Sequence, residues 1–165
     1  MSLQSVFEWL ESWPVSVGIR QSSWMFPAFE SVHVIAITLV VGSVMIVDLR
    51  VLGLASRKQR ITELSGSILP WTWCAFLVAL VSGSFLFAAK AHAYFDNVNF
   101  RLKIVLMAAA FLNMMAFHHG PYRSVRSWDV GVPAPALARL ACGLSLAFWV
   151  LIVAMGRWIG FSIEG

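Results

Sequence analysis

Histidines and charged side chains interrupt long apolar stretches of the sequence at a few places. These residues are Glu30, His33, Asp48, Lys90, His92, Lys103, His118, His119 and Arg157. Imidazole nitrogens ligate transition metals and haem iron, while carboxylates and basic groups orient such ligands or pair with anionic groups. An ionisable group in hydrocarbon costs several kcal/mol unless it is partnered, so each of these residues is a candidate functional residue.

The pair Glu30 and His33 has the spacing of a ligand with a supporting carboxylate. Residues three apart share one face of a helix, so the two side chains can hydrogen-bond. A histidine with a carboxylate behind it is typical of a metal or haem ligand. The alternative is structural: His33 only satisfies its hydrogen bonds with Glu30 or a carbonyl across the bundle.

A second group of candidates lies on the predicted third span, with His118 toward its inner end. One helix face carries Lys103, Met107, Phe111, Met114 and His118. A soft copper site is the alternative, with Met107, Met114, Met115, His118 and His119 as its ligands. His119 precedes Gly120-Pro121, so its main predicted role is to end the helix, with metal binding as the alternative.

Depth along the membrane separates the histidines. His33 and His118 are predicted to lie roughly 20 Å apart along the membrane normal, too far to be the two axial ligands of one iron. His92 is a weaker candidate ligand, roughly one and a half helical turns further out than His33. The arithmetic therefore predicts either two centres or a single ligand among these residues.

The composition places these residues in a membrane protein. Of the 165 residues, 59% are hydrophobic and 12% are charged, and the mean hydropathy is +0.79. A soluble domain carries roughly 25% charged residues. The 12 Lys and Arg form short clusters between apolar runs, so the net charge of +4 predicts contact with a lipid bilayer and no nucleic-acid binding.

Four stretches without Asp, Glu, Lys or Arg predict an all-α membrane protein, a four-transmembrane-helix bundle. The stretches are 31–47, 64–89, 104–122 and 140–156. A helix crosses the hydrocarbon in roughly 20 residues. We therefore expect one bundle over 24–165, with spans at about 24–52, 68–94, 100–119 and 136–160.

The segment 1–23 is expected to lie on the membrane surface as a short amphipathic helix. Leu3, Phe7 and Leu10 recur at helical spacing until Pro14 stops the pattern. The segment lacks the basic and apolar regions of a signal peptide.

The distribution of basic residues predicts the orientation of the bundle. Seven of the twelve Lys and Arg fall in the first and third loops, which the positive-inside rule places in the cytoplasm. Both termini are then periplasmic.

An ordered run of motifs extends from Trp24 to Phe161. It consists of Trp24…Phe26-Pro27…Glu30-x-x-His33, Asp48-Leu49-Arg50-x-Leu52-Gly53, Leu69-Pro70-Trp71-Thr72-Trp73, Asn99-Phe100-x-x-Lys103, Asn113…Phe117-His118, Trp128-Asp129 and Gly156-Arg157-Trp158-Ile159. The run resembles a bacterial family of small four-span inner-membrane proteins of unknown function. The resemblance implies four helices in the inner membrane and places His33 and His118, but not His92, on motif positions. At the level of fold alone, the chain also looks like small b-type cytochromes and copper-resistance membrane proteins.

Three functions fit these residues. The first is a redox subunit that carries electrons through haem b, with His33 and His118 as ligands. Its propionate partners would be Lys103, Arg157 and Lys90. The second is a copper-handling or transport protein that uses the His and Met side chains, and the third is a cofactor-free structural or assembly subunit. No catalytic motif is present, so an accessory subunit is favoured over an enzyme, with a redox or periplasmic protein or a second copy as partner.

Overall fold

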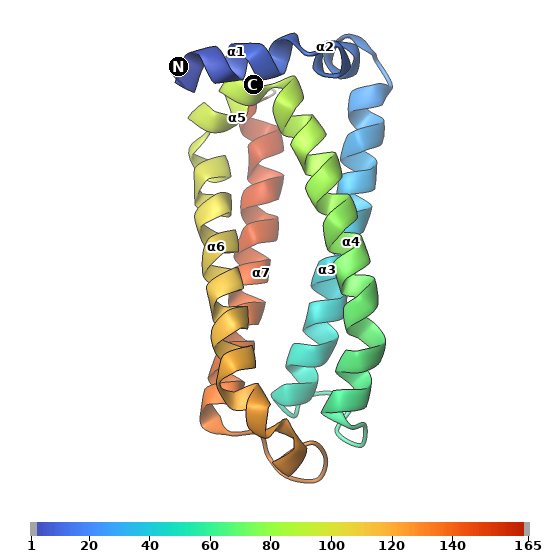
Figure 1. The fold of residues 1–165 in the computed structure, drawn as a ribbon, viewed down its shortest axis with the longest axis vertical. Helices are drawn as coiled ribbons and strands as arrows, with labels where there is room; N and C mark the ends of the chain where they lie inside the picture. The colour runs from blue at the N-terminus through green and yellow to red at the C-terminus, as the bar shows by residue number, and fades with distance from the viewer. Residues whose placement is uncertain (1–2, 164–165) are drawn as a thin grey trace.

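The computed structural model describes residues 3–163, which form an elongated helical bundle (Figure 1). The elements are α1 (Leu3–Ser12), α2 (Pro14–Gln21), α3 (Met25–Val51), α4 (Ile61–Ala89), α5 (Ala91–Asp96), α6 (Val98–His119), the 3₁₀ helix η1 (Pro121–Ser127) and α7 (Ala136–Ile163). Within residues 3–163 there is no β-strand, and the all-α class is confirmed.

Four of these helices, α3, α4, α6 and α7, are long and apolar enough to cross a membrane. The mean hydropathies of their most apolar segments are 2.3, 1.9, 1.6 and 2.1. Their exposed side chains include many large apolar residues, such as Ile35, Leu77 and Leu112. A surface of this kind suits hydrocarbon as its solvent, so the chain is a multi-pass membrane protein.

The helix boundaries differ from the expected spans mainly at α4. The other three long helices begin and end within three residues of the expected limits, whereas α4 begins at Ile61 rather than at about residue 68. The difference arises because Asp129, from a distant loop, accepts the backbone N–H groups at the start of this helix. At the other end, Lys90 leaves the helical region (φ −142°, ψ 50°), and the chain turns into α5.

The long helices pack as two pairs, α3 with α4 and α6 with α7, and α3 also contacts α7 (Figure 1). In the first pair the small residues Ala75 and Ala79 of α4 are buried, which allows α3 to approach closely. Thr72 of α4 donates a hydrogen bond to Ser43 Oγ of α3 at 2.8 Å.

Helices α1 and α2 lie across one end of the bundle, called here the terminal end because α7 also finishes there (Figure 1). The sequence predicted one amphipathic helix that stops at Pro14, but Pro14 instead begins a second helix. Proline is tolerated at the first helical position because the N–H that it lacks would have no partner there. Arg20 then joins α2 to the end of α4, because its Nη1 donates to Ala89 O at 3.1 Å.

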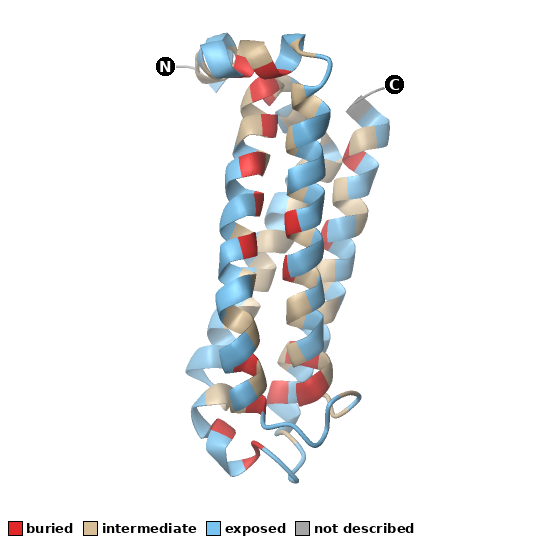
Figure 2. Ribbon diagram, turned by 90° about the vertical axis from the view of Figure 1, so that its right-hand side faces the viewer, coloured by how far each residue is buried: buried red, intermediate tan, exposed pale blue. Residues whose placement is uncertain are grey.

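The opposite end, called here the loop end, contains a compact apolar core. Its buried members are Val51, Ile61, Val125, Trp128, Ala138 and Cys142. Figure 2 shows buried residues gathered at this end and again at the terminal end, with single buried positions spaced along the helices between them. Gly53, with φ 75°, ends α3 in the left-handed conformation, and its N–H donates to Arg50 O at 3.0 Å.

Candidate functional site

His33 belongs to α3, and its imidazole ring lies against α4, which holds the ring in place. Its Nδ1 is 2.8 Å from Ala79 O and 3.1 Å from Ser82 Oγ. A carbonyl oxygen can only accept, so Nδ1–H is the donor. Ser82 donates its own proton to Val78 O at 2.6 Å, which leaves its oxygen able to accept from Nδ1. In the neutral imidazole, Nε2 therefore carries the free electron pair.

A glycine on α4 makes this position of the ring possible. A Cβ atom on Gly83 would lie 2.7 Å from Cε1 and 3.2 Å from Nδ1 of His33. Contacts of 2.7 Å are too short for carbon atoms, so the imidazole occupies the space that any side chain at this position would need.

Lys103 of α6 lies close enough to His33 for its charge to act on the imidazole. On α7, Gly156 leaves room for this lysine, since a Cβ atom there would lie 3.6 Å from Nζ. Lys103 is half-buried, and none of the ion pairs among residues 3–163 includes it. Its ammonium group is thus a cation inside the bundle that a bound anion would stabilise.

The hydrogen bonds of His33 do not involve Glu30 or His92, two other candidates from the sequence. Glu30 is exposed, and His33 bonds a carbonyl of α4, the structural alternative given above, rather than Glu30. His92 lies at the terminal end, where its backbone N–H donates to Glu11 Oε1 at 2.9 Å. Burial raises the pKa of Glu11, but the hydrogen bonds and charge of His92 and the charge of Arg20 outweigh it, so this pKa is below its ordinary value.

Three further candidates, His118, His119 and Arg157, are exposed. His118 and His119 end α6 near the loop end, and each Nδ1 bonds the carbonyl four residues earlier at 2.9 Å. Arg157 lies over the ring of Phe161, 4.9 Å from its centre. His33 and His118 therefore lie toward opposite ends of the bundle, and one iron cannot take both as axial ligands.

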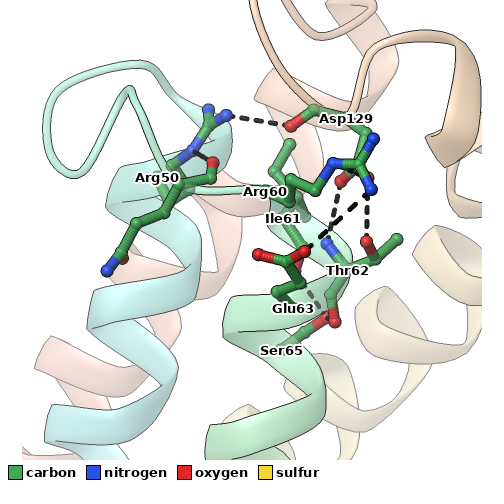
Figure 3. Close-up of polar contacts among 8 residues, drawn as sticks. Arg50, Arg60, Ile61, Thr62, Glu63, Ser65 and Asp129 are labelled. Carbon is green, nitrogen blue, oxygen red and sulfur yellow. Dashed lines mark hydrogen bonds and ion pairs between the residues drawn. The ribbon is translucent and has the colours of Figure 1, made fainter.

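The loop end holds a polar cluster that the sequence did not predict (Figure 3). Asp129 Oδ1 accepts the N–H of Thr62 at 2.9 Å, and Oδ2 accepts its hydroxyl at 2.8 Å. Arg60 lies 3.9 Å from the same carboxylate. The buried Arg50 donates to Asp129 O at 3.0 Å and to Gln59 O at 2.8 Å. The motifs Asp48-Leu49-Arg50 and Trp128-Asp129 were a signal for this cluster, but they do not show which residues pair.

The environment of Asp129 favours its ionised form. Burial raises the pKa of this carboxyl, but the two hydrogen bonds from Thr62, the charge of Arg60 and the N–H of Ile61 outweigh it. The pKa of Asp129 is therefore below its ordinary value, and the carboxylate is a structural anion that ties the loop to α4.

The fold and the site together define a multi-pass, all-helical membrane protein with one histidine fixed between two spans. The chain belongs to DUF6644, a family of unknown function, whose model matches residues 6–162. This match confirms the resemblance to a four-span family of unknown function. No protein with a curated description and no solved structure matches the chain.

Proposed function

We propose that this protein is a membrane-bound electron-transfer subunit in which His33 ligates the iron of haem b through Nε2. The observation that carries the proposal is the hydrogen bond from His33 Nδ1 to Ala79 O. A histidine that ligates a metal almost always donates its other ring N–H to a carbonyl, carboxylate or water, which orients the ring and makes the ligating nitrogen more basic.

The position of Lys103 also supports haem as the bound group. Its ammonium group lies inside the bundle near His33, without a carboxylate partner among the described residues. Haem b carries two propionate groups, and basic side chains are their usual partners. One haem would therefore pair with both interior groups, through its iron and through a propionate.

The ligand requirement favours haem over a copper ion. The porphyrin supplies four nitrogen ligands of its own, so the protein needs to add only one or two. A copper ion takes its ligands from the protein. Among residues 3–163, no three His, Cys, Asp or Glu side chains come together in a way that could hold a metal ion, so a copper site would also need methionine sulfur as a ligand.

Each chain offers one imidazole in this interior position. Any further ligand of the iron would have to come from another molecule, and electrons would have to reach the haem from a partner. A redox protein at the periplasmic side and a second copy of this chain are the two partners that fit this requirement.

We place the protein in the bacterial inner membrane with its terminal end facing the periplasm. The basic residues at the loop end are Arg50, Arg57, Lys58, Arg60, Arg123, Arg126 and Arg139. The loop end carries more basic residues than the terminal end, which supports a cytoplasmic position for the loop end. The haem at His33 then lies in the periplasmic half of the membrane.

The test is the haem content of the purified chain. The wild-type protein, expressed with excess haem precursor and purified in detergent, should give the spectrum of a b-type haem and a pyridine-haemochrome value near one per chain. His33→Ala should remove the haem, and Lys103→Met should weaken its retention during purification.

His118→Ala is the matched control, because His118 is exposed and bonds only a carbonyl of its own helix. It should retain the wild-type haem content. A well-folded wild-type protein without haem would overturn the proposal, and so would an unchanged haem content in His33→Ala. A folded, haem-free wild type whose thermal stability nevertheless falls in His33→Ala would assign His33 a structural role only.

A further inference from the structure

A buried carboxylate near the loop end of α3 lacks a counter-charge. Asp48 is 7% exposed, and its Oδ2 is shielded from solvent without a hydrogen-bond partner among the described residues. None of the ion pairs within residues 3–163 includes Asp48. An isolated carboxylate is expensive to bury, because water no longer solvates its charge.

The groups that face Asp48 from α7 are uncharged donors. The hydroxyl of Ser145 and the thiol of Cys142 hydrogen-bond to its carboxyl group. Cys142 is itself 3% exposed, so this contact is sealed from solvent on the α7 side. Neither donor supplies the positive charge that an ionised Asp48 would need.

The nearest basic residue along α3 does not supply a positive charge either. Arg50 is two residues further along α3, a spacing that does not bring side chains together, and its guanidinium donates to the carbonyls of Gln59 and Asp129. The last turn of α3 adds a partial negative charge, which disfavours a carboxylate further.

We propose that Asp48 is a proton-binding site, occupied by a proton at neutral pH. A proton is the cation that fits this place, because it needs no additional volume, whereas a sodium ion needs a coordination shell around the shielded Oδ2. The protonated acid can donate to Ser145 Oγ and leaves a neutral carbonyl oxygen at the unpartnered position. Release of the proton breaks its O–H bond and leaves the electron pair on Asp48.

Binding of this proton is linked to the contact between α3 and α7. The ionised form of Asp48 is stable only when water can solvate its charge. Water reaches this carboxylate when α7 moves away from it. The site is separate from His33 and does not depend on haem.

Infrared spectroscopy of the full chain in lipid vesicles tests the proposal. The sequence contains three aspartates, Asp48, Asp96 and Asp129, so ¹³C-labelling of aspartate carboxyl groups isolates their bands. At neutral pH we expect one ¹³C-sensitive C=O band of a protonated acid, which is absent in Asp48→Asn. It should persist in the matched control Asp129→Asn.

Ser145→Ala provides a second assignment that does not depend on the folding of Asp48→Asn. Loss of the hydrogen bond should move the band to higher frequency. The proposal is overturned if the wild-type aspartates show only ionised carboxylate bands at neutral pH. It is also overturned if the acid band remains in Asp48→Asn, or if its frequency does not change in Ser145→Ala. A band that disappears when sodium chloride replaces choline chloride would overturn it in favour of a metal-cation site.

Discussion

Asp129 caps helix α4 from a loop 67 residues further along the chain, with both of its carboxylate oxygens bonded to Thr62. The same residue accepts from Arg50 through its backbone carbonyl. Three parts of the sequence are therefore joined at one point of the loop end: the end of α3, the start of α4 and the loop before α7 (Figure 3).

Removal of this cap should destabilise the protein. Asp129→Ala should lower the free energy of unfolding by about 0.5–2 kcal/mol, the usual cost of a lost N-cap. Thermal unfolding in detergent micelles, followed by circular dichroism, measures the difference. Glu63→Ala is the control, because its side chain is 71% exposed and its pair with Arg60 should contribute less than about 1 kcal/mol. Equal losses in the two variants would contradict the role of the cap.

Acid should remove the contribution of Asp129. Its folded-state pKa lies below the unfolded value of about 3.9. A group with a lowered folded-state pKa stabilises the protein above its unfolded pKa, and that stabilisation disappears as the pH falls through the folded-state pKa. The advantage of wild type over Asp129→Asn should therefore be constant near neutral pH and shrink below about pH 4. An advantage that grows on acidification would disprove this assignment.

Gly83→Ala should displace His33. The added Cβ would lie 2.7 Å from the imidazole, so either the ring leaves Ala79 O or the two helices separate. We expect a lower unfolding temperature, partly restored by adding His33→Ala, as a double-mutant cycle would show. Gly42→Ala is the matched control, since nothing lies within 4 Å of its added Cβ, and a helical Gly→Ala change there should be neutral or stabilising by up to about 1 kcal/mol.

The orientation of the bundle can be read from fusions at its C-terminus. With the loop end in the cytoplasm, a C-terminal alkaline phosphatase fusion should be active and a green fluorescent protein fusion should be dark. The opposite pattern would reverse the membrane side assigned to His33 and Asp48.

The number of spanning helices could be predicted because the cost of charge in hydrocarbon is large and local. Each charge-free stretch identifies its own helix without information from the rest of the chain. The start of α4 could not be found in this way, since it depends on Asp129, a residue from another part of the sequence.

The surroundings of His33 were harder to predict from the sequence, for a related reason. Helical spacing compares residues of one helix, so it favoured Glu30 as the partner. The actual acceptor is the backbone carbonyl of Ala79, and every residue carries a backbone carbonyl. Asp48 presents the same problem, because Cys142 and Ser145 belong to a helix that begins far away in the sequence. Pairing across the bundle is a property of the packed structure.

The pair of helices that crosses the terminal end has a consequence for membranes of different thickness. Trp9 and Trp13 of this region are 56% and 42% exposed, and aromatic side chains of this kind hold a protein at the headgroup level. The span α4, with 29 residues, is about 44 Å long, against roughly 30 Å of hydrocarbon. When the bilayer thins or thickens, the bundle tilts about its anchored terminal end. The loops that carry arginines, at the other end, therefore change their depth in the membrane.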